Sequence, residues 1–165
     1  MKIKVVDNFL PSAEFEKLSQ SILSYNFPWY YNDCVVSNGD NDYQYFHRFY
    51  DVVDGTSNQY ELLTDTLNCI DGYRLKRAKA NSTTKRFFRR RTRYHTDMRV
   101  KENVITGILY INTNNGGTKF KNGPFVNSVA NRYVEFDCNL KHAGIHCTDQ
   151  KRRVVINFNF TRLSE

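Results

Sequence analysis

The stretch Tyr94-His95-Thr96-Asp97 decides the fold that we predict for this chain. His95 and Asp97 are two positions apart, so on a strand both side chains would leave the same face, because successive strand residues alternate. An imidazole nitrogen and a carboxylate oxygen on one face are two of the three ligands of the facial triad that holds non-haem Fe(II). The stretch therefore predicts a metal site that is completed by a histidine from another strand.

Two downstream histidines, His142 and His146, are candidates for the third ligand. They lie four positions apart, so on one strand they would share a face but sit too far apart to replace each other. The remaining histidine, His47, lies among aromatic residues, and we interpret it as a packed side chain without a metal role.

An arginine pair opens the run 152–160, which is rich in Val, Ile and Phe and is predicted to be a strand. Strand alternation puts Arg153 on the same face as Asn157, and Arg152 on the face of the apolar residues. The apolar pattern alone favours Arg152 as the inward residue, whereas a polar metal cavity favours Arg153. Either guanidinium could present a fork of donors to a carboxylate in that cavity.

Taken in order, these features resemble the 2-oxoglutarate and Fe(II)-dependent dioxygenases, specifically the prolyl 4-hydroxylase-like branch. The resemblance rests on a His-x-Asp pair, a distal histidine and an arginine that starts an apolar strand. Four further segments occur in the expected order: Val5 to Pro11, Gly107 to Asn112, Gly116 to Phe120, and Val134 to Asp137. The likeness covers the whole chain, most firmly residues 73–160, and is greatest to the small members found in bacteriophage genomes.

The resemblance implies a set of site residues. His95, Asp97 and His142 would be the metal ligands and catalytic centre, since the family places its distal histidine ten or eleven residues before the basic residue that binds the co-substrate. The small members also resemble this chain in having an arginine followed by three aliphatic residues and Asn-Phe-Asn. The spacing and this pattern imply that Arg153 binds 2-oxoglutarate, with Arg152 as the alternative. Tyr110 would offer its hydroxyl to the same carboxylate, although a core tyrosine is an equally good interpretation.

Other polar residues are weaker candidates for the pocket. Asn112 and Thr118 lie within the segments that resemble the family and are candidate polar groups of the pocket. Lys79 and Asn81 lie on a strand expected to border the site and are candidates to contact the co-substrate or the substrate.

The resemblance also implies an activity. The expected cofactors are Fe(II), 2-oxoglutarate as co-substrate and O2, and the expected reaction is hydroxylation of a C–H bond with release of succinate and CO2. A peptidyl prolyl residue is the first expectation for the substrate, and a free amino acid or a nucleic-acid base is the second. Fold analogy by itself does not choose among them.

The predicted elements indicate an α+β fold. A helix is expected from Ser12 as N-cap, with Phe15, Leu18 and Ile22 on its packing face. A second helix is expected to start at 55–58 and end at Asp71-Gly72. After a first strand at 2–6, the strands are expected at 73–81, 87–95, 103–112, 117–120, 125–129, 133–137, 142–146 and 153–160. This pattern fits a double-stranded β-helix (a cupin-like jelly roll) of about eight strands, with both helices on one side.

Length and composition fit one domain over residues 1–165, with a catalytic core at about 73–160. No apolar run is long enough to span a membrane and no signal peptide is evident, so we expect no membrane partner. The four scattered cysteines suit reduced thiols in a cytoplasm, which would be that of the host if a phage encodes the chain.

The net charge of +7 is concentrated in the segment Arg86 to Arg93, just before the His-x-Asp pair. Such a run is most simply a solvated face. The alternative function is a non-enzymatic basic β-domain that binds nucleic acid through this segment, with Phe87 and Phe88 stacking on bases. A metal-binding or structural protein without turnover is a third hypothesis.

Overall fold

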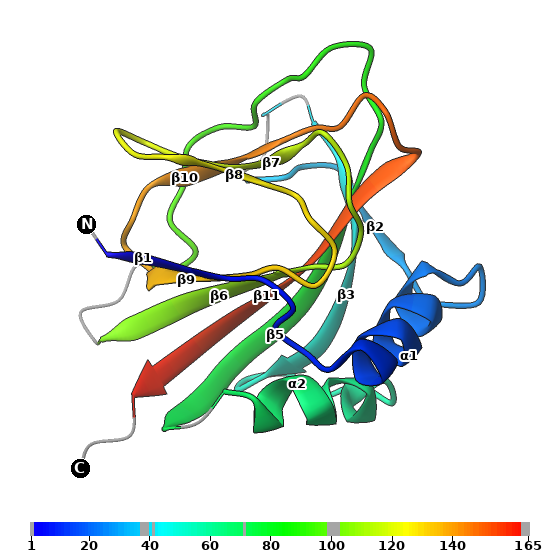
Figure 1. Ribbon diagram of the computed structural model, residues 1–165, viewed down its shortest axis with the longest axis vertical. Coiled ribbons are helices and arrows are strands. Elements are labelled where there is room, and N and C mark those ends of the chain that lie inside the picture. The colour runs from blue at the N-terminus through cyan, green and yellow to red at the C-terminus, as the bar shows by residue number, and fades with distance from the viewer. Residues whose placement is uncertain (1, 37–39, 41, 71, 99–102, 163–165) are drawn as a thin grey trace.

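The computed structural model describes residues 2–36, 40, 42–70, 72–98 and 103–162. Two antiparallel sheets face each other, and the helices lie at one side of the larger sheet (Figure 1). The strands of the larger sheet, in spatial order, are β1 (Ile3–Val6), β9 (Tyr133–Asp137), β6 (Val104–Tyr110), β11 (Arg152–Arg162), β5 (Tyr73–Thr84), β3 (Gln44–Asp51) and β2 (Tyr30–Asn32), with β4 (Gly55–Thr56) paired to β3. The smaller sheet consists of β10 (His142–Ile145), β7 (Gly117–Phe120) and β8 (Phe125–Asn127).

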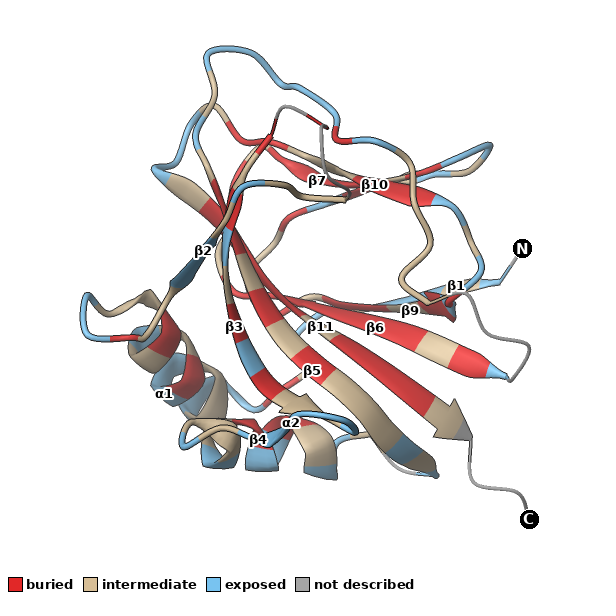
Figure 2. Ribbon diagram, turned by 180° about the vertical axis from the view of Figure 1, so that it is seen from behind, coloured by how far each residue is buried: buried red, intermediate tan, exposed pale blue. Residues whose placement is uncertain are grey.

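Strand β11 is central to the larger sheet because it pairs with β5 on one side and with β6 on the other. Its Val, Ile and Phe residues favour the extended backbone, and alternation gives the strand two different faces. Val154, Ile156 and Phe158 are fully buried on the face that packs toward the helices. Arg153 and Asn157 lie on the opposite face, which is directed toward the smaller sheet. Buried residues run along β11 and β5 (Figure 2), with the hydrophobic core on one face of these strands and a mostly polar cavity on the other.

Helix α1 (Ser12–Leu23) covers the core face of the larger sheet. Leu18 and Ile22 are buried and Phe15 packs against the same cluster, as the helical spacing predicted. The predicted N-cap is wrong by one residue. Pro11 occupies the N-cap position and no side chain caps the helix, because Ser12 already has its place in the first turn.

The second predicted helix is shorter than expected. Gly55 and Thr56 form the short strand β4, so the chain turns into helix only at a 3-10 segment, Tyr60–Leu63, which continues as α2 (Thr64–Asn68). Leu63 and Leu67 still pack into the core. Asp71 of the predicted helix end lies outside the described residues. Neither described helix has the length and apolar character needed to cross a membrane.

The predicted strand at 87–95 is wrong. This segment runs beside β10 as an irregular loop, with isolated β-bridges at Arg91 and His95 in place of a continuous ladder. Arg86 N donates to the Cys147 carbonyl, His146 N to the Arg90 carbonyl and Thr92 N to the Gly144 carbonyl, which attaches the segment along β10 and the residues that follow it. The unequal spacing of these bonds, with several residues of the loop left between them, keeps the segment from forming a regular strand.

Candidate metal centre

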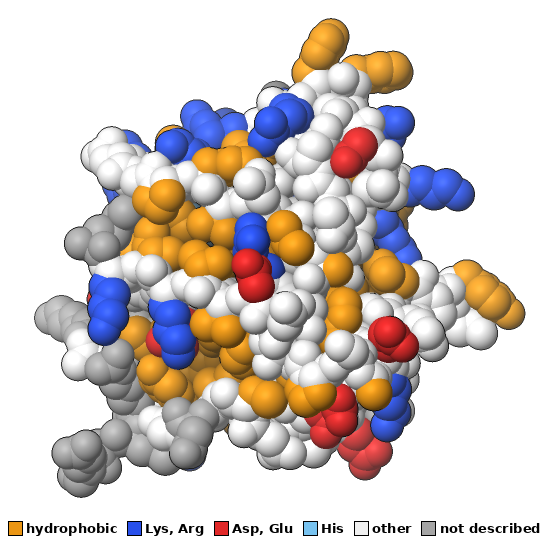
Figure 3. Space-filling view, viewed as in Figure 1, with side chains coloured by type: hydrophobic (Ala, Val, Ile, Leu, Met, Phe, Trp, Pro, Cys, Tyr) orange, Lys and Arg blue, Asp and Glu red, His pale blue; other side chains and the backbone are white. Residues whose placement is uncertain are grey.

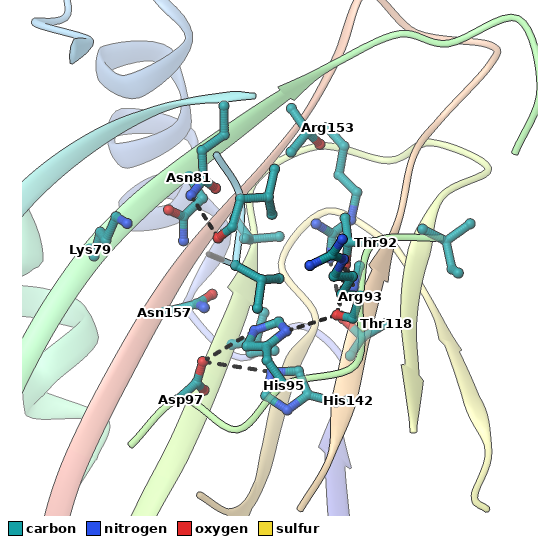
Figure 4. A pocket seen from close by; sticks show the side chains of 18 of the residues that line it. Lys79, Asn81, Thr92, Arg93, His95, Asp97, Thr118, His142, Arg153 and Asn157 are labelled. Atoms are coloured by element: carbon teal, nitrogen blue, oxygen red, sulfur yellow. Dashed lines mark hydrogen bonds and ion pairs between the residues drawn. The ribbon is translucent and has the colours of Figure 1, made fainter. Parts of the chain in front are cut away.

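His95, Asp97 and His142 come together at one end of the space between the sheets (Figure 4). One ligand atom from each residue lies within 4.8 Å of the other two. Asp97 Oδ1 is 3.8 Å from His95 Nε2 and 3.7 Å from His142 Nε2. The loop supplies the first two residues and β10 supplies the third, so the ligand set arises although His95 and Asp97 do not lie on a regular strand.

Both imidazoles are held through Nδ1. His95 Nδ1 lies 3.2 Å from the carbonyl of Arg93, and His142 Nδ1 lies 2.9 Å from the carbonyl of Leu140. A carbonyl only accepts hydrogen bonds, so these contacts place the ring proton on Nδ1 and leave the Nε2 lone pair directed at Asp97. Fixing the tautomer in this way is the usual preparation of a histidine for a metal.

The electrostatics of the cluster suit a divalent cation. Burial, followed by the proximity of His142, lowers the pKa of His95 and favours its neutral form. Asp97 Oδ2 is buried and has no hydrogen-bond partner among the described residues. This buried oxygen lies beside two imidazole nitrogens, and a donor set of two nitrogens and one oxygen fits Fe(II).

The three residues open into a cavity of about 630 Å³. Such a volume is typical of sites that hold small molecules. The lining is mostly polar, and Asp97 is its one carboxylate among the described residues. Its positively charged lining residues are Arg77, Lys79, Arg93 and Arg153. The cavity therefore favours anionic ligands.

Arg153 lies in the cavity and is only 7% exposed. It donates through Nη2 to Thr118 Oγ1 at 3.2 Å, whereas its Nε has no partner in the described part of the chain. Within the same residues it pairs with no carboxylate, and burial lowers its pKa. A buried guanidinium without a counter-ion is costly unless a ligand provides the charge. Arg152 points the other way, donating to the carbonyl of Leu23 at 2.8 Å.

Tyr110 lies behind this arginine and does not line the cavity itself. Its hydroxyl donates to Thr118 Oγ1 at 2.7 Å, and the Arg153 guanidinium lies 5.5 Å from its ring centroid. Thr118 thus accepts from both neighbours, which leaves its own hydroxyl hydrogen free to donate into the cavity. A Cβ on Gly116 would lie 2.5 Å from the carbonyl oxygen of Ile145 and 3.1 Å from Arg153 Cδ, so this close approach needs glycine.

The other predicted residues separate into two groups. Lys79 and Asn81 line the cavity, whereas Asn112 does not. The Asn112 side chain accepts from Val154 N at 2.9 Å and donates to the Arg152 carbonyl at 2.9 Å, which fixes the start of β11.

The two remaining histidines are buried. His146 lines the cavity and its Nε2 lies 2.9 Å from Asp42 Oδ2, while Arg86 pairs with Oδ1 of the same carboxylate. His47 packs against aromatic rings and contacts the Pro28 carbonyl at 2.9 Å, as its surroundings in the sequence predicted.

Sequence reasoning did not single out Arg77 or Asn157 as site residues, yet both line the cavity. The signal was present, because Arg77 is two positions before Lys79 on β5 and Asn157 is four positions after Arg153 on β11. Strand residues separated by an even number of positions lie on the same face, so Arg77 shares a face with Lys79, and Asn157 shares one with Arg153.

The segment Arg86 to Arg93 lies on the surface beside β10. Phe87 and Phe88 are 98% and 83% exposed, so they do not point inward. Arg89 stacks on Phe125 and Arg91 on Tyr94. Basic side chains gather in the upper half of the molecule, over the smaller sheet, whereas acidic ones gather at the lower right, over the helices (Figure 3).

Comparison with solved structures places this arrangement in a known fold. A prolyl hydroxylase from Trichoplax adhaerens, solved with a peptide of hypoxia inducible factor, matches with a TM-score of 0.70 and 13% identity over 97% of this chain and 83% of that chain. A Pseudomonas putida prolyl-4-hydroxylase matches with a TM-score of 0.63 and 16% identity, over 98% of this chain and 93% of that chain. The viral collagen prolyl hydroxylase of Paramecium Bursaria Chlorella virus-1, in its 2-oxoglutarate complex, matches with a TM-score of 0.59 and 15% identity, over 99% of this chain and 97% of that chain.

The chain thus has the double-stranded β-helix fold of the 2-oxoglutarate and Fe(II)-dependent oxygenases. This confirms the α+β fold class predicted from the sequence. The same fold serves other chemistry as well, since the nogalamycin epimerase SnoN matches with a TM-score of 0.64 at 12% identity over 97% of this chain and 76% of that chain. No protein-family model and no curated protein sequence matches the chain.

Proposed function

We propose that this protein is an Fe(II)- and 2-oxoglutarate-dependent dioxygenase that hydroxylates a C–H bond, with residues 1–165 acting as one domain and 73–160 as its catalytic core. One observation carries the proposal. A His-Asp-His cluster and a buried arginine without an acidic partner among the described residues open into the same cavity. A metal alone would not require the arginine, and a buried guanidinium without a counter-ion is costly unless a ligand supplies the negative charge.

In this proposal His95, Asp97 and His142 hold Fe(II) and leave coordination positions open for ligands. Iron bound there, together with 2-oxoglutarate and O2, supplies the oxidising power for hydroxylation and releases succinate and CO2. The chain's own contribution is position and charge. The carbonyls of Arg93 and Leu140 hold the two imidazoles by Nδ1, so the nitrogen lone pairs stay directed at the metal position.

Arg153 is proposed to bind the distal carboxylate of 2-oxoglutarate. Its Nε, unpaired within the described residues, and the hydroxyl hydrogen of Thr118 offer two donors, one from each of the two facing sheets. Tyr110 orients Thr118 by donating a 2.7 Å hydrogen bond to it. The phenol of Tyr110 stays protonated, because burial raises the pKa of Tyr110. Burial also excludes water from this end of the cavity, which strengthens a charge-assisted pair.

A peptide with a prolyl residue is the first candidate substrate. The Trichoplax adhaerens protein is a prolyl hydroxylase in complex with a peptide fragment, and the two sheets here are arranged in the same fold. The four cysteines are all free thiols, which supports a reducing compartment such as the cytoplasm.

The test is an anaerobic titration of Fe(II)-loaded protein with 2-oxoglutarate, which follows the visible charge-transfer band of the chelate. The band should appear in wild type and be lost in His142→Ala. A matched control is His47→Gln, which alters a buried histidine that contacts Pro28 and lies outside the cavity. A folded, metal-loaded wild-type protein without the band would disprove the dioxygenase proposal.

Nucleic-acid binding is a second candidate, because Phe87 and Phe88 are exposed beside arginines. Stacking on bases would then be combined with phosphate contacts. This candidate expects salt-sensitive binding of a single-stranded oligonucleotide that Phe87→Ser and Phe88→Ser weaken together and that His95→Ala leaves unchanged. Binding that both sets of variants leave unchanged would rule it out.

A further inference from the structure

Lys79 is a second cation in the cavity that lacks an acidic partner. It lines the cavity from the middle of β5, and within the described residues its ammonium group makes no hydrogen bond or ion pair. The ammonium group does lie over the Phe46 ring, whose centroid is 4.8 Å from Nζ. Burial, and then the proximity of Arg77 and Arg48, lower its pKa to about 8. A lysine in such a place is a candidate for a ligand contact.

The neighbouring cations are satisfied, which sets Lys79 apart. Arg48 lies directly opposite Lys79 on β3 and pairs with Asp54. Arg77 donates to Asn159 Oδ1 at 3.0 Å and to the carbonyl of Asp97 at 3.5 Å. The one carboxylate that acts on Lys79 within the described chain is that of Asp97, which the proposed function already commits to the metal.

Two amide oxygens on the same wall also lack partners in the part of the chain that the structure describes. Asn157 lies directly opposite Lys79 in the β11–β5 pair, and Asn81 is two positions further along β5. Oδ1 of each is buried without a hydrogen-bond partner from the described residues, although both side chains line the cavity. Figure 4 shows Lys79, Asn81 and Asn157 along one side of the cavity, on the strands of the larger sheet. This wall therefore offers one positive charge and two acceptors to a ligand.

Arg153 and Lys79 mark separate positions. The residue opposite Arg153 on β5 is Thr83, four residues from Lys79. At about 3.3 Å per strand residue, the two backbone positions are about 13 Å apart, and Figure 4 shows the side chains apart as well. The distal carboxylate of the co-substrate is assigned to Arg153. A negatively charged group that pairs with Lys79 therefore has to come from another molecule.

We propose that the substrate brings a carboxylate into the cavity that pairs with Lys79, while N–H or O–H groups beside it donate to Asn81 and Asn157. The inference rests on the proposed function and names the substrate class for that site. An uncharged prolyl ring alone would leave Lys79 half-buried and without an acidic partner among the described residues. Two sources offer the required chemistry: the α-carboxylate of a free amino acid, and an aspartate or glutamate next to the reacting residue of a peptide.

The experiment compares acids with their amides. Fe(II)-loaded protein with 2-oxoglutarate and O2 is offered the twenty free amino acids and the corresponding amino-acid amides. In a second arm it is offered blocked dipeptides, acetyl-Glu-X-amide and acetyl-Gln-X-amide, with X varied over the same residues. Succinate release and a mass gain of one oxygen report turnover. The free-acid arm and the glutamyl arm distinguish the two sources.

Binding of the turned-over acid is then measured without O2, through the change it causes in the charge-transfer band. Wild type should bind the acid about tenfold or more tightly than its amide, as for other paired charges in a protein site. In Lys79→Met this ratio should fall to about one, whereas the exposed control Lys121→Met should keep the wild-type ratio. A merely structural role for Lys79 would weaken acid and amide equally.

Three results would overturn the inference. The first is turnover of neutral compounds at the same rate in wild type and Lys79→Met. The second is no turnover of any acid by protein that forms the charge-transfer band. The third is loss of 2-oxoglutarate binding itself in Lys79→Met, which would assign this lysine to the co-substrate. Failure of wild type to form the band would instead count against the proposed function.

Discussion

His95 and His142 face each other across an antiparallel β-bridge, and each backbone N–H donates to the carbonyl of the other at 2.9 Å. The loop that carries His95 and Asp97 is thus attached by backbone hydrogen bonds to the strand that carries His142. A metal that binds this cluster meets ligands already in place, so little binding free energy is lost in ordering them.

Metal binding should therefore stabilise the fold. At a hundredfold excess over its Kd, Mn(II) should raise the free energy of unfolding by about 2.7 kcal/mol, which corresponds to about 5 to 10 °C in Tm for a chain of this size. Thermal melts with and without Mn(II) measure the shift. Asp97→Asn should lose most of it, and the exposed control Asp65→Asn on α2 should keep it. An equal shift in both variants would place the metal elsewhere.

Only one of the two adjacent arginines should affect the affinity for the co-substrate. Arg153→Lys replaces a buried fork of donors by a single ammonium group and should weaken 2-oxoglutarate binding by about 2 kcal/mol, or roughly thirtyfold. Arg152→Lys should leave the Kd unchanged, because Arg152 donates to Leu23 and stacks on Trp29 outside the cavity. Calorimetry under anaerobic conditions measures both constants. Equal losses in the two variants would contradict the assignment of Arg153.

Lys79 should destabilise the metal-free protein at neutral pH. Its pKa falls from 10.5 to about 8 on folding, so between these values the unfolded chain binds more protons and stability rises with pH. Lys79→Met should be more stable than wild type at pH 7, by about 1 kcal/mol or more. The difference should shrink as the pH is raised from 8 to 10.5. Urea denaturation at several pH values tests this, and a difference that stays constant would show that burial of the charge is not its cause.

Opposite faces of β11 should respond differently to substitution. Ile156→Val removes a methyl group from the fully buried core and should cost about 0.5 to 1.5 kcal/mol of stability, with an unchanged Kd for 2-oxoglutarate. Asn157→Ala removes a cavity residue whose Oδ1 has no partner among the described residues, so stability should change little. Denaturation and calorimetry on both variants would reveal any coupling between the two faces.

The sequence predicted most of this architecture because hydrophobic alternation is a local property. The predicted strands at 117–120 and 133–137 match β7 and β9 residue for residue, and those around His142 and Arg153 begin within one residue of β10 and β11. Alternation also put Arg153 and Asn157 on one face, as observed.

The errors arose where long-range contacts decide the backbone. The segment 87–95 has a strand-like composition, but its backbone hydrogen bonds to β10 are too unevenly spaced to form a continuous β-ladder. No local sequence pattern reveals that spacing. The sequence likewise does not reveal that the Lys79 ammonium group lacks an acidic partner among the described residues. That depends on tertiary contacts, since Asp54 pairs with Arg48 and Asn159 accepts a hydrogen bond from Arg77.

The alternation along β11 and β5 has an evolutionary consequence. The proposed metal ligands are on the loop and on β10, whereas the wall bearing Lys79, Asn81 and Asn157 belongs to the larger sheet. If the proposed function holds, replacing those few inward side chains would change which compound the cavity accepts and leave both the proposed metal ligands and the core intact. A chain built in this way can diversify its chemistry at little risk to its folding, and libraries for altering its selectivity need to randomise only that wall.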